Sequence, residues 1–480
     1  MPILAILYIL VLVYTISRIL LDTNSTPKTL AYLLLVFMIP GIGILVYFSF
    51  GINYRHHQAT SKGVQAQLKI DEFFQKQIVN ETELLIKEGK DEIAHFLPMI
   101  RFLNGLGSEY LFRSDFTLLV NGETKFPEVL ASLEQAQHFI HMEYYAWDND
   151  IRGNQIKDVL LKKAKEGVKV RALYDDYASR EIRHTIVKEL REGGVEIHPK
   201  IKVKLKQFAN RINHRDHRKI IIIDGKFSFV GGINLSDRYD NSIDTGLFWR
   251  DTHVKITGLL TTSLQRHFLV SWNSSVAEPI SFSNTLFPQE FLRANEGIAA
   301  LGQVVAGGPI YPKSNIMLSY MKIFSLATEK LYITNPYFIP NETIMNALCQ
   351  AAIAGVDVRL MIPEKPDSAI VGAASKFYFT ELLNAGVRIF LYKKGFVHAK
   401  TVVADSRVSV VGTANMDIRS FDLNFEIMSI IYGTEFARRM EDMFQADLAE
   451  CKEVSNVGWQ KKKTGQRLIY AIARLISSFL

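Results

Sequence analysis

Two segments of the chain carry the same five residues at the same spacing. The first holds His217, Lys219, Asp224, Gly231 and Asn234, and the second holds His398, Lys400, Asp405, Gly412 and Asn415. Typical residue frequencies give such a match by chance at about 10⁻⁷ per position. The two segments are therefore copies of one unit.

Each copy places an imidazole next to an ammonium group. The residues that follow Lys219 and Lys400 are apolar or β-branched, which predicts a buried strand in each copy. Side chains at i and i+2 share one face of a strand, so His217 lies beside Lys219 and His398 beside Lys400. A twofold pairing of the copies would bring the four groups together. Such a cluster repels itself unless an anion fills it, and a phosphate is the natural ligand.

Individual positions in the motif have simpler explanations. A single His-x-Lys pair more often belongs to a solvated strand face, and only the duplication favours a site. Asp224 and Asp405 precede turn-like residues. Each carboxylate can therefore fix the hairpin between two strands instead of touching a substrate.

The elements around the motifs are repeated as well. Short β-rich runs alternate with helical stretches, which is typical of an α/β architecture. Residues 167–171 recur as 355–359, and residues 194–197 recur as 386–389, in the same order. Each copy begins with a glycine that is expected to end a helix, followed by the next strand. The sequence predicts an α/β fold with two duplicated domains, in which mixed sheets flanked by helices are related by a pseudo-twofold axis.

Two long apolar runs, residues 2–21 and 29–50, precede this body. Each is long enough to cross a hydrocarbon core of about 30 Å, and the polar stretch between them allows an antiparallel return. The runs predict a two-helix transmembrane hairpin. A cleaved signal peptide is the alternative for the first run, but its one charge, Arg18, lies near the far end. Basic residues after the second run favour a cytoplasmic body by a narrow margin.

The whole chain is expected to comprise five parts. They are the hairpin at 1–57, amphipathic linker helices at 58–109, a first domain at 110–290, a second at 291–455 and a basic amphipathic tail at 456–480. In the tail, lysine and arginine are interspersed with leucine and isoleucine at helical spacing, which is typical of a helix in a membrane interface. Packing of its apolar face on the body is the alternative.

The composition of the chain limits which classes of partner and cofactor are expected. The net charge of +7 suits an anionic partner. A hydrophobic content of 48% with 22% charged residues excludes intrinsic disorder. Two cysteines are too few for a disulfide framework or a cysteine-rich zinc module. The acidic pairs at 148–150 and 175–176 are expected to serve turns, so neither a metal nor another cofactor is predicted.

A basic stretch precedes the first motif. Its members are Lys200, Lys202, Lys204, Lys206, Arg211 and Arg215. We expect it to guide anionic lipid headgroups toward the site. A solvated strand edge accounts for the lysines equally well.

The duplicated motif resembles the signature of the phospholipase D superfamily, and the resemblance covers nearly all of residues 110–450. More narrowly, the sequence resembles the bacterial cardiolipin synthases. The paired N-terminal helices, Trp249–His253 after the first motif and Asn415–Ser420 after the second fit that family. One departure is Gly232, where many members of the superfamily have serine, whereas the second copy has Thr413. The first half therefore offers no hydroxyl to a phosphate at this position.

This resemblance implies a phosphatidyltransferase that works through two histidines without a metal. His217 would attack phosphorus to form a phosphohistidine, and His398 would act first as acid and then as base. Other implied site residues are Lys219, Lys400, Asn234 and Asn415 at the phosphate oxygens, and Asp224 and Asp405 as catalytic residues of the motifs. Glu426 lies 28 residues after His398 and Asp244 lies 27 residues after His217, and the resemblance implies that these carboxylates orient the histidines.

The implied substrate is phosphatidylglycerol in an anionic bacterial cell membrane. Two molecules would give cardiolipin and glycerol, which conserves the number of phosphodiesters and needs no activated nucleotide. A membrane-bound hydrolase of phospholipid or nucleic acid, and a silent membrane scaffold, are the alternatives. Intact histidines in both copies argue against the scaffold, and the apolar N-terminal runs argue against nucleic acid as a partner. The sequence leaves the oligomeric state open.

Overall fold

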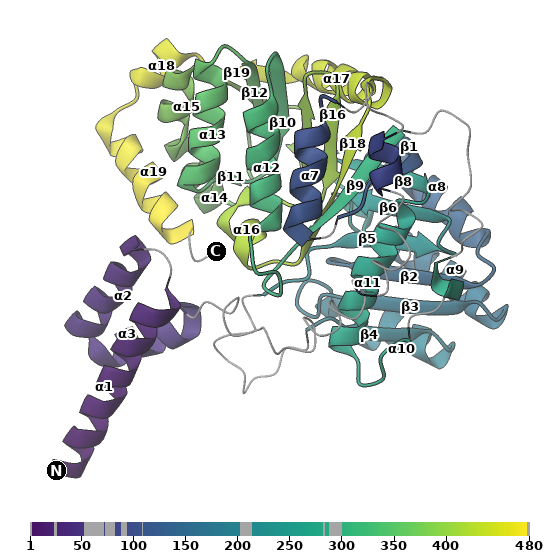
Figure 1. The fold of residues 1–480 in the computed structure, drawn as a ribbon, viewed down its shortest axis with the longest axis horizontal. Coiled ribbons are helices and arrows are strands. Elements are labelled where there is room, and N and C mark those ends of the chain that lie inside the picture. The colour runs from purple at the N-terminus through teal and green to yellow at the C-terminus, as the bar shows by residue number, and fades with distance from the viewer. Residues whose placement is uncertain are drawn as a thin grey trace.

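A mixed sheet of 15 strands joins the two halves of the protein (Figure 1). The computed structural model describes residues 2–23, 26–51, 72, 82–87, 94–107, 109–201, 214–281, 284–287 and 300–477. From the centre outward, the first half contains β1 (Phe112–Val120), β8 (Thr252–Gly258), β6 (Phe227–Gly231), β5 (Lys219–Ile223), β2 (Phe139–Tyr144), β3 (Lys169–Tyr174) and β4 (Glu196–Pro199). The second half contains β9 (Ala300–Gly307), β18 (Glu426–Tyr432), β16 (Val408–Gly412), β15 (Thr401–Ala404), β10 (Lys330–Thr334), β12 (Asp357–Pro363), β13 (Arg388–Tyr392) and the edge strand β19 (Cys451–Glu453).

The strand order shows that the predicted duplication is the symmetry of this sheet. β1 and β9 pair antiparallel at its centre, with Arg113 opposite Leu301, and equivalent strands follow in the same order on each side. Gly167 and Gly355 occupy equivalent positions after a helix, with φ values of 92° and 94°. Both adopt the left-handed conformation that commonly ends a helix. The predicted α/β class with two repeated halves is confirmed.

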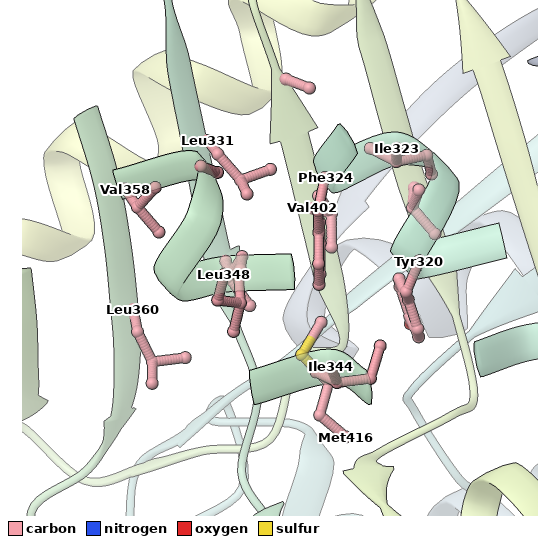
Figure 2. Packing of buried hydrophobic residues seen from close by; sticks show 14 of the residues in the cluster. Tyr320, Ile323, Phe324, Leu331, Ile344, Leu348, Val358, Leu360, Val402 and Met416 are labelled. Atoms are coloured by element: carbon pink, nitrogen blue, oxygen red, sulfur yellow. The ribbon is translucent and has the colours of Figure 1, made fainter. Parts of the chain in front are cut away.

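Helices cover both faces of the sheet. The first half contributes α8 (Asn121–Glu134), α9 (Ile151–Lys165), α10 (Ile186–Glu192) and α11 (Thr261–Ser275). The second half contributes α12 (Asn315–Leu326), α13 (Glu342–Ile353), α14 (Ala369–Phe377), α15 (Phe379–Ala385), α16 (Ile418–Asp422) and α17 (Thr434–Leu448). Figure 2 shows side chains of α12 and α13, among them Phe324 and Leu348, packed against Leu331 and Val402 of the strands.

The strands that carry the motifs are buried on both faces. Ile220–Ile223 of β5 and Thr401–Ala404 of β15 are all buried. A continuous apolar, β-branched run is what a central strand covered by helices on both sides requires. The histidine and lysine of each motif are therefore attached to the interior of the sheet and not to a surface loop.

The N-terminal region differs in part from the predicted hairpin. Among the described residues, one helix, Ile3–Asp22 within α1 (Pro2–Asp22), has the length and apolarity to cross a membrane. The second apolar run is broken at Pro40 into α2 (Thr26–Met38), α3 (Pro40–Val46) and a π-helical turn. Gly43 lies so close to the backbone of Val36 that a Cβ there would come within 2.6 Å of the Val36 Cα atom, so α3 folds back onto α2. α2 alone is about 20 Å long, which is shorter than a hydrocarbon core.

The predicted linker helices lie largely outside the described residues. Within 58–109 the structure describes a helical segment at 82–87 and α7 (Leu97–Gly107). Met99, Ile100 and Leu103 of α7 are buried in the core of the second half. This part of the linker is therefore packed on the body of the protein.

Candidate active site

The backbone just before each motif strand is hydrogen-bonded to the other half of the protein. The backbone N–H of His217 donates to the carbonyl of Phe425 (3.0 Å), and that of His398 donates to the carbonyl of Arg250 (2.7 Å). Two short strands, β7 (Trp249–Arg250) and β14 (Phe396–Val397), pair in parallel across the same junction. The pseudo-twofold axis thus brings both histidines to one place between the halves.

Both histidines line a single cavity of about 560 Å³. The wall is rich in aromatic and basic side chains, namely Tyr145, Tyr177, Tyr239, Trp249, Tyr337, Arg215, Arg238 and Arg419. The ring of Tyr145 lies 4.7 Å from that of His217, and the rings of Tyr239 and Trp249 each lie 5.5 Å from that of His398. Arginines in an aromatic-walled cavity suit an anionic group attached to a larger apolar molecule.

A carboxylate from the opposite half holds each imidazole. The Nδ1 atom of His217 lies 2.9 Å and 3.0 Å from the two carboxylate oxygens of Glu426. The Nδ1 atom of His398 lies 2.7 Å from an oxygen of Asp251. A carboxylate that accepts from Nδ1 fixes the ring and leaves Nε2 for chemistry. The two pairs are therefore crossed, since neither histidine uses the carboxylate of its own half.

Asp244 does not have the orienting role that the sequence analysis gave it. Its carboxylate is exposed and accepts a hydrogen bond from the backbone of Gly246. Spacing from the histidine does not identify the carboxylate, because the segment between the motif asparagine and the carboxylate is longer in the first half than in the second. Strand register identifies the equivalent residues: Gly231 pairs with His253 and Gly412 with Met428. Asp251 and Glu426 each lie two residues before those partners, so they occupy equivalent positions in the two halves.

Burial shifts the pKa values of all four motif side chains downward, and repulsion by neighbouring ammonium groups adds to this shift at His217, Lys219 and His398. Burial is the larger cause, and it lowers the pKa of Lys219 to about 7 and that of Lys400 to about 8. Burial and the neighbouring ammonium groups lower the pKa of His398 to about 4 and hold that of His217 well below its usual range. Burial therefore favours the uncharged forms of these four groups, and a bound anion would favour their charged forms.

The two lysines lie behind the histidines. Each ammonium donates to the backbone carbonyl of its own motif histidine, at 2.7 Å for Lys219. Both side chains are buried, and neither residue lines the cavity. A positive charge on either lysine would still attract an anion in the cavity, because the protein between them has a low dielectric constant and screens the interaction little.

The two motif asparagines differ in the hydrogen bonds that their side chains make. Both line the cavity. Asn234 donates to the hydroxyl of Tyr239 (2.6 Å) and accepts from the backbone of Ala146 (3.3 Å). The side-chain oxygen of Asn415 is buried without a hydrogen-bond partner. A buried polar atom without a partner is costly, so Asn415 is the asparagine that is open to a ligand.

Asp224 and Asp405 are structural, which corrects their place among the catalytic residues. Each lies at the far end of its motif strand with a φ of 52°. Asp224 accepts from the backbone N–H groups of residues 137–139 at 2.7–2.8 Å, and Asp405 accepts from those of residues 328–330 at 2.8–2.9 Å. Neither lines the cavity. They fix the start of the neighbouring strands β2 and β10, whereas the sequence suggested that they fix the hairpin turn after each motif strand.

Replacing Asp405 by asparagine should destabilise the protein by about 2 kcal/mol at pH 7 without removing activity. Burial alone would raise the pKa of Asp405, but hydrogen bonds from the backbone of Lys330, Glu329 and Thr328 lower it. A lowered folded-state pKa means that this stabilisation is complete above about pH 4, the unfolded value, and is lost as the pH falls further. Unfolding in urea at several pH values measures the difference. An unchanged stability with a large loss of turnover would contradict the structural role.

The position after the first motif glycine has no room for a side chain. A Cβ at Gly232 would lie 2.1 Å from a carboxylate oxygen of Asp251. In the second half, the Thr413 hydroxyl at this position donates to Glu426 and accepts from the N–H of Ile427. The hydroxyl therefore serves the orienting carboxylate, and the departure at Gly232 reflects the space that Asp251 occupies.

Replacing Gly232 by serine should lower turnover on the order of 10²-fold, because the new side chain displaces Asp251 and with it His398. Gly105 in α7 has no atom within 4 Å of an added Cβ, so Gly105→Ser is the matched control. Steady-state rates of the two variants measure the effect. Equal rates would show that Asp251 can move without consequence.

The residues of the basic stretch before the first motif and of the acidic pairs lie in different surroundings. Lys200 is buried and donates to Ser271 and Ser274, both at 2.8 Å, so it does not guide headgroups. Arg215 lines the cavity, whereas Lys202, Lys204, Lys206 and Arg211 lie outside the described residues. Asp150 caps α9 by accepting from Gly153, as expected of turn chemistry. In the described part of the chain, no group of three or more His, Cys, Asp or Glu residues could hold a metal.

Comparison with known proteins agrees with this geometry. A family model described as "Cardiolipin synthase, PLD-like domain" matches residues 129–268 and 320–448, and one described as "Phospholipase_D-nuclease N-terminal" matches residues 6–51. Cardiolipin synthase 2 of Bacillus cereus is 39% identical over 465 residues, covering 96% of this chain and 88% of its own. This chain belongs to the cardiolipin synthase family. The resemblance inferred from the motifs is confirmed, and the protein is a phosphatidyltransferase.

Other members and a solved structure extend the comparison. The major cardiolipin synthase of Bacillus subtilis is 32% identical over 480 residues, covering 99% of this chain and 98% of its own. The crystal structure of phosphatidylserine synthase from Haemophilus influenzae aligns with a TM-score of 0.57 at 15% identity, covering 80% of this chain and 97% of that one. That structure shares the fold. Cardiolipin synthase family membership thus extends through both halves of the chain and its N-terminal region.

Proposed function

We propose that the protein transfers a phosphatidyl group from one phosphatidylglycerol to another, giving cardiolipin and glycerol. The observation that carries the proposal is the pair of crossed histidine–carboxylate couples facing one cavity. Two imidazoles with free Nε2 atoms provide one nucleophile and one proton carrier, which suffices for exchange of one alcohol for another at phosphorus. Relatives named cardiolipin synthase support the choice of substrate.

In the first step, Nε2 of His217 attacks phosphorus and the bond from phosphorus to the glycerol oxygen breaks. His398 donates its proton to that oxygen, so neutral glycerol leaves. In the second step, His398 takes the proton from a hydroxyl of the incoming phosphatidylglycerol, whose oxygen attacks phosphorus as the P–N bond breaks. Lys219 and Lys400 offset the charge that develops on the non-bridging oxygens, and Asn234 and Asn415 orient the phosphate.

The environments of the two carboxylates favour His217 as the nucleophile. Burial and the charges of Lys219 and Lys400 hold the pKa of His217 well below its usual range, which favours the neutral imidazole, and the Glu426 carboxylate that accepts from its Nδ1 leaves Nε2 free. Burial alone would raise the pKa of Asp251, but the charge of His398 and the hydrogen bond to it lower the pKa of Asp251 overall. A firmly ionised Asp251 supports a protonated His398 once the phosphate is bound. The two histidines have the same motif, so the carboxylate bonded to each one distinguishes the nucleophile from the acid.

The bilayer is the source of both substrates in this proposal. α1 would anchor the chain, and the catalytic body would lie on the cytoplasmic face, where the positive-inside preference puts it. Tethering holds the cavity near a high local concentration of phosphatidylglycerol. The anionic headgroup would meet a cavity lined by Arg215, Arg238 and Arg419.

The decisive experiment gives the purified protein phosphatidylglycerol in mixed micelles with EDTA and identifies the products by mass spectrometry. Cardiolipin and glycerol in equal amounts are expected. Phosphatidic acid as the main product would mean that water wins the second step and the protein is a hydrolase. Activity that is lost with EDTA and restored by a metal would contradict the two-histidine mechanism.

A further inference from the structure

The C-terminal helix lies beside the active-site cavity. α19 (Thr464–Ser477) packs along α14, at the edge of the second half (Figure 1). Ala473 of α19 is buried with Ile339 and Ala374 in one apolar cluster. Ser477, at the last described turn, is itself a wall residue of the cavity. The C-terminal end of α19 therefore forms part of the cavity wall.

α19 has two different faces. Tyr470, Ala473 and Ser477 recur at helical spacing and face the body of the protein, where Ala473 and Ser477 are buried. The other face carries large apolar side chains that remain exposed, namely Leu468 (60%), Ile469 (59%), Ile472 (49%) and Leu475 (60%). Four adjacent exposed leucines and isoleucines form a patch of a kind that soluble surfaces rarely keep.

Charge next to this patch indicates what covers it. Lys461, Lys463 and Arg467 are exposed at the start of α19 and in the turn before it. Arg474 lies over the ring of Phe377, 4.3 Å from its centroid. A short helix with an apolar face bordered by basic residues is suited to the boundary between the headgroups and acyl chains of an anionic bilayer.

The apolar surface continues from the cavity to α19. Ile339 and Val371 line the cavity, and both belong to the cluster that contains Ala473. A phosphate at His217 and His398 therefore has an apolar wall on the side of α14 and α19. A lipid needs such a wall, because its acyl chains must not be drawn into water when its headgroup enters the site.

We propose that the exposed face of α19 (Leu468, Ile469, Ile472 and Leu475) lies in the surface of an anionic bilayer and sets the cavity mouth against the lipid. The acyl chains of a bound lipid then follow the wall of α14 and α19 while its headgroup reaches the histidines. The identity of that lipid rests on the proposed function, whereas the placement of the helix does not.

Depth labelling tests the placement directly. The full chain, with Cys349→Ser and Cys451→Ser, would carry an environment-sensitive fluorophore at Ile472→Cys and be reconstituted in phosphatidylglycerol vesicles. Ile353 in α13, exposed at 74%, provides the matched control as Ile353→Cys. We expect blue-shifted emission and quenching by spin-labelled lipid at position 472 but not at 353. Equal emission and equal quenching at the two positions would overturn the proposal.

A kinetic test uses Leu468→Gln, Ile472→Gln and Leu475→Gln together. The triple variant should be slower by about tenfold on long-chain phosphatidylglycerol in vesicles, because binding to the interface scales with buried apolar area. It should retain the wild-type rate on a short-chain phosphatidylglycerol below its micellar concentration. Ile353→Gln should match the wild type on both substrates. Equal losses on vesicles and on monomers would refute an interfacial role. A deep label at 472 in a protein that makes no cardiolipin would instead refute the proposed function alone.

Discussion

Replacing His217 or His398 by alanine should each lower the rate of cardiolipin formation by about 10⁴-fold or more. Each imidazole has a separate part in both steps, because one carries phosphorus while the other carries the proton. The double variant should be no slower than the slower single variant, since the two residues act as a unit. Appreciable turnover by either single variant, measured as cardiolipin formed from phosphatidylglycerol, would refute the two-histidine mechanism.

The two variants should differ on an activated substrate. Phosphatidyl p-nitrophenol has a leaving group that needs no acid, so His398→Ala should still release one equivalent of p-nitrophenolate as the phosphatidyl group is transferred to Nε2 of His217. His217→Ala should release none and form no acid-labile phosphohistidine. Rapid mixing with optical detection measures the burst. A burst from His217→Ala alone would exchange the roles of the two residues.

The structure explains which parts of this site could be predicted from sequence. The motif repeat is a local property of the chain, and it correctly predicted a buried strand in each copy. Each histidine lies just before its strand, and its lysine lies behind it and not beside it at the cavity. Convergence of the two copies followed from symmetry. The pairing of each histidine with a carboxylate of the opposite half could not be predicted in this way. It depends on how the segments before β5 and β15 pair with the opposite half.

Residues that look alike in the motif have different roles in space. Asp224 and Asp405 are as regular in the repeat as the histidines, yet they lie at the other end of the strand. Spacing alone cannot separate a residue kept for the fold from one kept for the site. The second apolar run shows the same limit, since its composition suited a span but Pro40 and the close approach of Gly43 to α2 turn it back.

Asp251→Asn and Glu426→Gln should each lower cardiolipin formation by about 10²–10⁴-fold, whereas Asp244→Asn should leave it unchanged. Loss of the Asp251 carboxylate removes the negative charge that favours a protonated His398 once the phosphate is bound, so the leaving glycerol loses its proton donor. Loss of the Glu426 carboxylate frees the ring of His217 to take the wrong tautomer. Asp244 is the matched control because it lies on an exposed turn of the same loop.

The rates of Asp251→Asn and Glu426→Gln should also differ in how they change when the substrate has a better leaving group. Phosphatidyl p-nitrophenol should restore the first step of Asp251→Asn, because that variant lacks only the proton donor. It should not restore Glu426→Gln, whose nucleophile is misoriented. Burst amplitude and rate separate the two cases. If both variants were restored equally, or if Asp244→Asn were as slow as either, the crossed pairs would be a feature of packing and the histidines would be oriented by other groups.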